Sequence, residues 1–375
     1  MKNINLYIIV LISFLLSFSS FAKEKELDSL LIEAKLKVYT DPLEVIKIGD
    51  SLYNNEEFDL KEQINGVLLI ADALISIRNY SQALEYLNIG KEILNGQKEE
   101  ELEVKLFSRF GYLYFQLDFY DEALAYLKRA EKINEEKEES KEYFANLGYF
   151  STVRGLIYRE IINCEMGLRY FRKALKYFSQ SEETINRINL SVVHYNMGNC
   201  FLSMEDYQAA EESFKSASKT ASLFGQERNS LKLFAEKGII NLSIAQGNHQ
   251  EAIQELKALY KDAEKINDKS LLRSITLDLS SSYLEEKDWK SFQYYADKNR
   301  AFNDEIINFK KEATVIALKS FDRSQETLLI QNKEKIQLKI ILSLLIFLIL
   351  FVFLGVVIIK NRREIRKMQA RLFQN

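Results

Sequence analysis

The sequence predicts an all-α protein, because residues that interrupt helices are scarce and apolar residues recur at helical spacing. The 375 residues include one proline and 13 glycines, whereas average usage of about 5% and 7% would give roughly 19 and 26. Proline and glycine mark turns and long loops, so short connections should join the helices. A strand-rich fold and an enzyme that holds phosphate on a glycine-rich loop are therefore disfavoured.

An internal repeat is the second observation. A small residue is followed three positions later by an aromatic one, twelve later by another small residue and sixteen later by an aromatic or a leucine, as in Gly198, Phe201, Ala210 and Phe214. Residues three or four apart share a helix face, so the small residues let two antiparallel helices approach closely. One pair cannot bury its apolar face alone, so pairs stack. The second small position recurs every 38 to 44 residues, at Val45, Ala83, Ala123, Gly167, Ala210, Ala252 and Phe292.

This pattern resembles the tetratricopeptide repeat family, in a lengthened form of about 40 residues per pair, over residues 26–300. The resemblance implies an α-solenoid of about six or seven helix pairs. It also implies a concave groove, lined by the first helix of each pair, that binds a protein or peptide. The residues expected to face this groove are Arg109, Tyr112, Arg159, Tyr195, Asn199, Lys237 and Asn241. For each of them an ordinary surface role is the alternative.

Two of these residues match a more specific site of the family. Lys237 and Asn241 stand where its carboxylate-clamp adaptors place a lysine and an asparagine. The next repeat, however, carries Asp278 where those adaptors use an asparagine. Binding of a C-terminal carboxylate is therefore not supported.

The composition gives no sign of catalysis or of nucleic-acid binding. Lys and Arg number 51 against 54 Asp and Glu, without the basic excess of a nucleic-acid footprint. His194 and His249 lack partners at metal-ligand spacing. Cys164 and Cys200 fall at helix-packing positions, which favours buried thiols, with a disulfide as the alternative outside the cytoplasm. We therefore predict no enzymatic activity, no cofactor and no metal site.

The two ends of the chain predict a membrane topology. Residues 1–22 read as a signal peptide, with Lys2, an apolar stretch and small residues at Ser20 and Ala22; an uncleaved anchor helix is the alternative. Residues 340–359 carry no charge and would span about 30 Å, so 338–360 is predicted as a transmembrane helix. The basic tail 361–375 would then be cytoplasmic and the repeats periplasmic, at the inner membrane.

Between the solenoid, 23–300, and the apolar segment lies a predicted helical stalk, 301–337. Its apolar residues alternate steps of four and three, which is typical of a coiled-coil seam and would allow a homodimer. The alternative is a single long helix that caps the solenoid. The seam residues are Phe302, Ile306, Phe309, Ala313 and Ile316.

The function predicted from these features is a non-catalytic, membrane-anchored periplasmic scaffold or sensor for a protein or peptide. The layout resembles the sensor half of Bacteroidetes-type membrane signalling proteins with tetratricopeptide repeats, which continue into a histidine kinase or a helix-turn-helix regulator. The alternative is a truncated or split signal-transduction protein whose output domain is missing or separately encoded. A third hypothesis is an assembly factor for envelope complexes.

Overall fold

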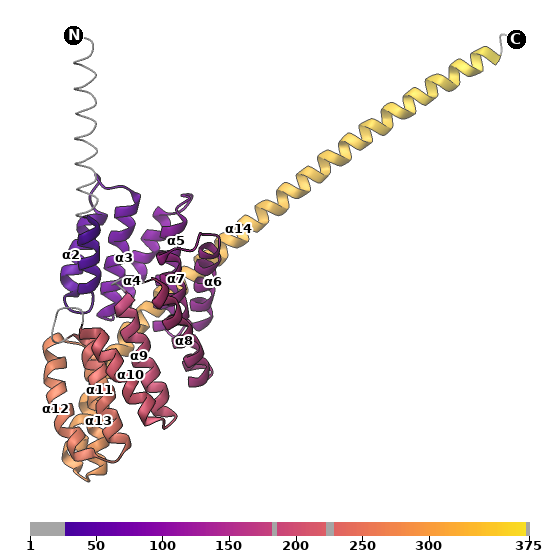
Figure 1. Cartoon of the computed structure of the whole chain (residues 1–375). Helices are drawn as coiled ribbons and strands as arrows, with labels where there is room; N and C mark the ends of the chain where they lie inside the picture. Colours follow the sequence, from indigo (N-terminus) through magenta and orange to yellow (C-terminus); the bar gives the residue numbers. More distant parts are fainter. Residues whose placement is uncertain (1–26, 182–185, 223–228, 373–375) are drawn as a thin grey trace, which may run out of the picture. The chain divides into compact units, whose positions relative to one another are not determined.

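The structure, a computed structural model of the whole chain, describes residues 27–181, 186–222 and 229–372 (Figure 1). The predicted signal peptide, 1–22, lies outside these residues. Within the described ranges the chain forms helices joined by turns, and no strand occurs there. The predicted all-α class is therefore confirmed.

The helices follow one another with short connections, as the scarcity of proline and glycine predicts. Residues 27–37 are helical and precede α2. The elements that follow are α2 (Pro42–Tyr53), α3 (Leu60–Ser76), α4 (Tyr80–Ile93), α5 (Glu100–Gln116), α6 (Tyr120–Glu135), α7 (Lys141–Ile161), α8 (Cys164–Ser181), α9 (Asn186–Ser203), α10 (Tyr207–Ala221), α11 (Ser230–Ala245), α12 (His249–Ile266), α13 (Lys269–Glu285) and α14 (Trp289–Leu372).

The helices are arranged as stacked pairs. α3 packs with α4, α5 with α6, α7 with α8, α9 with α10 and α11 with α12. Each first helix also contacts the first helix of the next pair, in the order α3, α5, α7, α9, α11 and α13. This second set of contacts makes the first helices one continuous layer, which is the arrangement of an α-solenoid.

The turn between the two helices of a pair has a common conformation in five pairs. Arg78, Asp118, Glu205 and Lys287 have φ between 58° and 66°, and Gly247 has φ 83°. Each lies five residues before the second small position, so the left-handed residue recurs with the repeat. In the first of these turns the Asn79 N–H donates to the Leu74 carbonyl at 2.9 Å, which is the long bond of a Schellman cap.

Close helix crossings explain the small residues of the repeat. Ala123, Ala210 and Ala252 are fully buried. Phe214 of α10 is also fully buried, and a Cβ added to Gly198 of α9 would lie 2.6 Å from its ring. Gly238 of α11 faces the same ring from the next pair. One aromatic side chain therefore fills a gap that two glycines open in neighbouring pairs.

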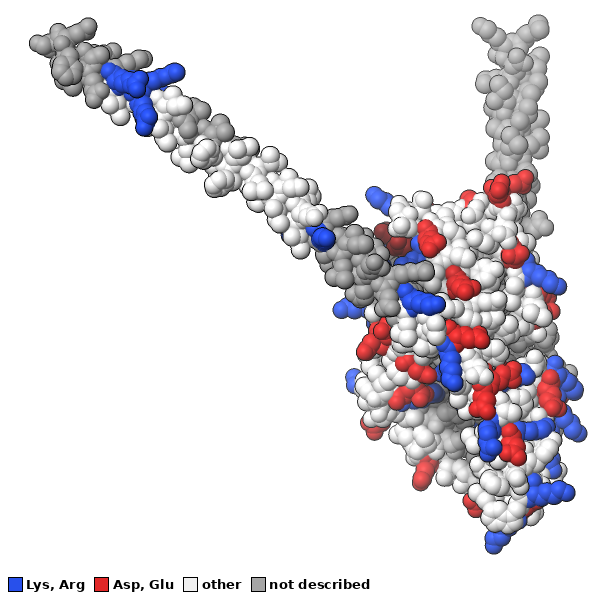
Figure 2. All heavy atoms as spheres, turned by 180° about the vertical axis from the view of Figure 1, so that it is seen from behind, with Lys and Arg blue, Asp and Glu red and all other residues white. Residues whose placement is uncertain are grey.

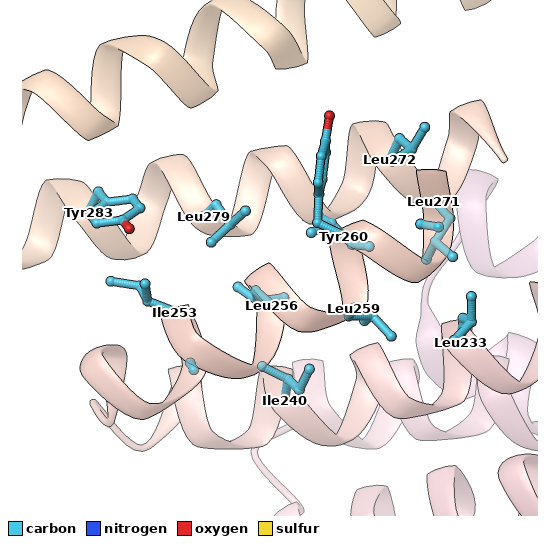
Figure 3. Close-up of a cluster of buried hydrophobic side chains, with 13 residues drawn as sticks. Leu233, Ile240, Ile253, Leu256, Leu259, Tyr260, Leu271, Leu272, Leu279 and Tyr283 are labelled. Atoms are coloured by element: carbon cyan, nitrogen blue, oxygen red, sulfur yellow. The ribbon is translucent and has the colours of Figure 1, made fainter. Parts of the chain in front are cut away.

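The last pairs show how the core continues across repeats. Leucines of α12 lie between apolar side chains of α11 and α13 in one cluster (Figure 3). Leu256 and Leu259 come from α12, Ile240 from α11, and Leu279 from α13. Phe292 and Phe302 of α14 pack against the same cluster. The start of α14 therefore serves as the second helix of the last pair.

The chain divides into two compact units, Met1–Thr314 and Val315–Asn375. In the first unit Ile306 and Ala313 are buried, at 8% and 0% exposure. Two residues of the predicted coiled-coil seam are thus covered within one chain. This is the arrangement that the alternative, a helix capping the solenoid, requires.

The second unit contains the remainder of α14, which is unbroken to Leu372. Its apolar side chains between 336 and 359 are exposed where they are described, and Lys360, Arg362 and Arg363 follow them. Figure 2 shows this uncharged stretch and the basic group beyond it.

The predicted membrane topology is corrected by one finding. A spanning helix needs about 20 predominantly apolar residues, and within the described part of the chain no helix reaches the length and apolar content required to cross a membrane. Side chains at 349, 352 and 355–357, inside the predicted segment, are outside those described. The finding overturns the localisation predicted above, a single-pass inner-membrane protein with periplasmic repeats and a cytoplasmic tail.

Candidate binding groove

A cavity of about 200 Å³ lies on the layer of first helices. Residues 35–39 and helices α3, α5, α7 and α9 contribute to its walls, so it extends over several successive pairs. Apolar and polar side chains share the lining. The polar ones include Lys35, Tyr39, Asn65, Asp72, Lys105, Arg109, Tyr112, Glu142, Asn146, Tyr149 and Asn189.

An ion pair between Asp72 and Arg109 lies in the cavity wall. Arg109 Nε donates to the Asp72 carboxylate at 2.9 and 3.2 Å, and Nη2 donates to Oδ2 at 3.1 Å. Both side chains are about one-fifth exposed, at 22% and 21%. The two-pronged geometry fixes the orientation of the guanidinium, because planar donors meet planar acceptors. The pair also ties α3 to α5, one repeat apart.

Three tyrosines, Tyr39, Tyr112 and Tyr149, share the cavity wall with this ion pair. The Arg109 guanidinium lies over the Tyr149 ring, 5.1 Å from its centre, where the ring quadrupole attracts a cation. Burial raises the pKa of Tyr149, and Asp72 adds to the increase. Burial likewise raises the pKa of Tyr39 and of Tyr112. These three hydroxyls therefore stay protonated at neutral pH and can donate hydrogen bonds into the cavity.

A second charged group joins α5 to α7. Lys105 Nζ lies 3.1 Å from Glu142 and also contacts Glu101. Burial works against its charge, but the two carboxylates outweigh burial and raise the pKa of Lys105. The ammonium is therefore present at neutral pH and held by its neighbours.

The structure brings two of the seven expected groove residues, Arg109 and Tyr112, into the cavity wall. Arg159 instead contacts Asn196 of α9 and its neighbour Glu160. Tyr195 packs between rings, with centroid distances of 6.0 Å to Phe214 and 5.6 Å to Phe234. Asn199 is partly exposed on α9 and is not part of the cavity wall.

Lys237 and Asn241 belong to a buried polar group between α11 and α13. Lys237 is only 3% exposed and forms an ion pair with Asp278. With the Asn241 amide oriented to match its neighbours, its oxygen accepts from Lys237 Nζ at 3.0 Å and its nitrogen donates to Asp278 Oδ2 at 2.8 Å. The lysine charge is thus satisfied within the chain, and Asp278 is its partner.

Several cavity residues were not among those expected from the sequence. Asp72 directly follows Ala71, the first small position of a weaker repeat copy, just as Tyr112 follows Gly111. Its register could therefore have identified it. Tyr149 and Glu142 precede Gly155, the first small position of their repeat copy. They lie in the first part of α7, which at 21 residues is longer than the other first helices of the repeats.

The histidines, cysteines and carboxylates outside the cavity are the remaining candidates for metal binding or thiol chemistry. Among the side chains described, no group of three or more His, Cys, Asp and Glu is arranged to hold a metal ion. Cys164 and Cys200 are both free thiols. Cys200 is buried in the core of α8 and α9, and Cys164 Sγ lies 3.3 Å from the Ser203 hydroxyl. The absence of enzymatic activity stays a prediction.

The sequence pattern of the tetratricopeptide repeat matches residues 104–137 and 192–221. These ranges fall on α5–α6 and α9–α10, two of the pairs described above. This chain contains tetratricopeptide repeats. No curated protein sequence matches it, and none of the comparisons supports the predicted resemblance to Bacteroidetes-type sensors.

The solved structures with a fold similar to that of this chain include the following two. A Rap protein in complex with Competence and Sporulation Factor is 13% identical, with a TM-score of 0.51, over 68% of this chain and 79% of that one. NprR in complex with its cognate peptide NprX is 14% identical, with a TM-score of 0.53, over 76% and 78%. At these identities the likeness concerns the fold.

Proposed function

We propose that this chain is a scaffold that binds a peptide or an extended protein segment across its layer of first helices. The observation that carries the proposal is the cavity of about 200 Å³, which crosses several repeats as an elongated ligand would. The complex of NprR with its cognate peptide supports it, because that protein has a similar fold.

The chemistry of the cavity suits a peptide. Carboxylate, guanidinium and tyrosine groups at Asp72, Arg109 and Tyr149 lie beside apolar side chains such as Leu68 and Val192. Peptide N–H and C=O groups need polar partners, whereas apolar side chains need a dry surface. A lining of both kinds can satisfy both requirements along one segment.

The expected groove residues take three roles in this proposal. Arg109 and Tyr112 contact the ligand directly. Arg159 and Asn199 extend the same layer along α7 and α9. The remaining three, Tyr195, Lys237 and Asn241, support the layer by fixing α9, α11 and α13 to their neighbours.

The proposal is tested by selecting random displayed peptides on the full chain and measuring the affinity of a selected peptide by fluorescence anisotropy. Arg109→Met, which keeps the bulk of the side chain, should weaken that peptide at least tenfold, or about 1.4 kcal/mol. Arg172→Met is the matched control, since Arg172 is exposed on α8, away from the cavity wall. Equal affinity for both variants, or no selectable peptide, would count against the groove.

A further inference from the structure

A contact between distant parts of the first unit closes the array of repeats on itself. Lys310 of α14 forms an ion pair with Asp118, at 2.7 Å, although the two are 192 positions apart. Asp118 is the left-handed residue of the turn that joins α5 to α6. This turn ends the helix that supplies Arg109 and Tyr112 to the cavity.

The early part of α14 is well fixed before it reaches that turn. Lys298 Nζ lies 3.1 Å from the Tyr260 hydroxyl, and the Asn299 amide donates to the Arg273 carbonyl at 2.6 Å. Lys269 and Glu305 form an ion pair at 3.3 Å. α14 therefore leaves the last pair in a defined direction.

One face of α14 carries the closing contact. Ile306, Lys310 and Ala313 are spaced by four and three residues, so they lie on the same side of the helix. Ile306 and Ala313 are buried and flank the ion pair, whereas the neighbouring Ile307 and Lys311 are exposed. The contact thus combines two buried apolar side chains with a partly exposed ion pair.

A second observation shows the same closure nearer the N-terminus. A cavity of about 60 Å³ is lined both by residues 38–40, 42 and 76–78 and by Ser230 with residues 266–269. Ile77 and Arg78 form the turn after α3, and Asn267 and Asp268 form the turn between α12 and α13. Early turns of the array therefore lie beside its last pairs in two places.

We infer that residues 306–313 of α14 act as a latch that closes the repeat array and sets the spacing between its early and late pairs. The apolar part of the contact, Ile306 and Ala313, is small, and the side chains of Lys310 and Asp118 are 32% and 58% exposed. The latch can therefore open while the helix pairs stay folded. Opening separates α5–α6 from α12–α13 and changes the width of the groove.

The first test is a charge exchange read by hydrogen exchange on the full chain. Asp118→Lys and Lys310→Glu should each raise the exchange rates of amides 304–314 about tenfold, while the double variant restores the slow rates. Lysine is tolerated at position 118, because Lys287 has φ 58° at the equivalent turn. Lys311→Glu makes the same charge change beside the latch and should leave exchange unchanged.

The second test measures the spacing itself. Spin labels at Lys128 of α6 and Glu255 of α12, both exposed, in a Cys164→Ser, Cys200→Ala background should give one distance in the closed form. Asp118→Lys should lengthen or broaden that distance, and adding Lys310→Glu should reverse the change. Three results would each overturn the latch. The first is that the single variants have the same exchange rates as Lys311→Glu, and the second is that Asp118→Lys leaves the spin-label distance unaltered. The third is that the double variant does not recover the slow exchange rates or the original distance. Peptide affinity enters neither test, so the proposed function stands or falls separately.

Discussion

The packing of Phe214 between two glycines predicts a specific coupling. A Cβ at position 198 would lie 2.6 Å from the ring of Phe214, which is closer than two non-bonded carbon atoms can approach. Adding one methyl group to a tightly packed core costs about 1–3 kcal/mol. Replacing glycine by alanine within a helix returns about 0.5–1 kcal/mol. We therefore expect Gly198→Ala to lower the free energy of unfolding by about 1–2 kcal/mol.

A smaller side chain opposite should relieve that strain. Phe214→Leu alone leaves a gap and costs about 1–2 kcal/mol. In the double variant the alanine methyl occupies part of the gap, so the combined loss should fall short of the sum by at least about 1 kcal/mol. Urea unfolding followed by circular dichroism at 222 nm measures all three variants against the unsubstituted chain.

The control uses a side chain that packs on a glycine of another pair. Leu127 packs on Gly111 in the α5–α6 pair, and Leu127→Ala should combine additively with Gly198→Ala. If Gly198→Ala proves neutral or stabilising, or if it adds fully to Phe214→Leu, the close approach is not the reason for the glycine.

Three further predictions concern the turns, the buried charges and the thiols. Lys287→Gly should stabilise the chain by about 0.5–1 kcal/mol in thermal unfolding, and Gly247→Ala should destabilise it by more, because both positions are left-handed; equal effects at the two turns would contradict this reasoning. Lys237→Met should lower the free energy of unfolding in urea by about 3 kcal/mol, because it leaves the Asp278 carboxylate without its partner. Adding Asp278→Asn should recover most of that loss. A double variant no more stable than Lys237→Met alone would argue against the ion pair. Burial raises the pKa of Cys200, so at pH 8 less of it is thiolate; mass spectrometry should show iodoacetamide alkylating it at least about tenfold more slowly in the folded chain than in urea.

The helix pairs could be predicted from the sequence because their determinants are local. Gly198, Ala210 and Phe214 mark one crossing, and their spacing is fixed by helix geometry alone. The fold of α9 and α10 follows from that register, as does the burial of Ala210. The pairs around Gly111 and Gly155 are predictable from the same local spacing.

The groove was less predictable because its contacts join different repeats. Asp72 and Arg109 are 37 positions apart, and the repeat copy around Ala71 matches the pattern weakly. Nothing local distinguishes an arginine that faces solvent from one that meets a carboxylate of the neighbouring pair. Lys237 shows the same difficulty, since its partner Asp278 comes from the next repeat.

The apolar face of α14 shows a different limit. Residues such as Ile306 and Ala313 have the spacing of a coiled-coil seam, and periodicity correctly indicates a helix with one apolar side. It does not indicate what covers that side. The structure buries both residues within the first unit, whereas the seam would have paired them with a second chain.

In a stacked array each repeat contacts only its neighbours, so the stability of the array is that of a linear series of units joined by interfaces. Either end of a line can fray, because the terminal unit is held by a single interface. The ion pair between Lys310 and Asp118 and the turns that meet around Arg78 and Asp268 turn that line into a ring. A unit in a ring is released only after two interfaces break, so partial unfolding from the ends should be rarer here than in an open array of the same length.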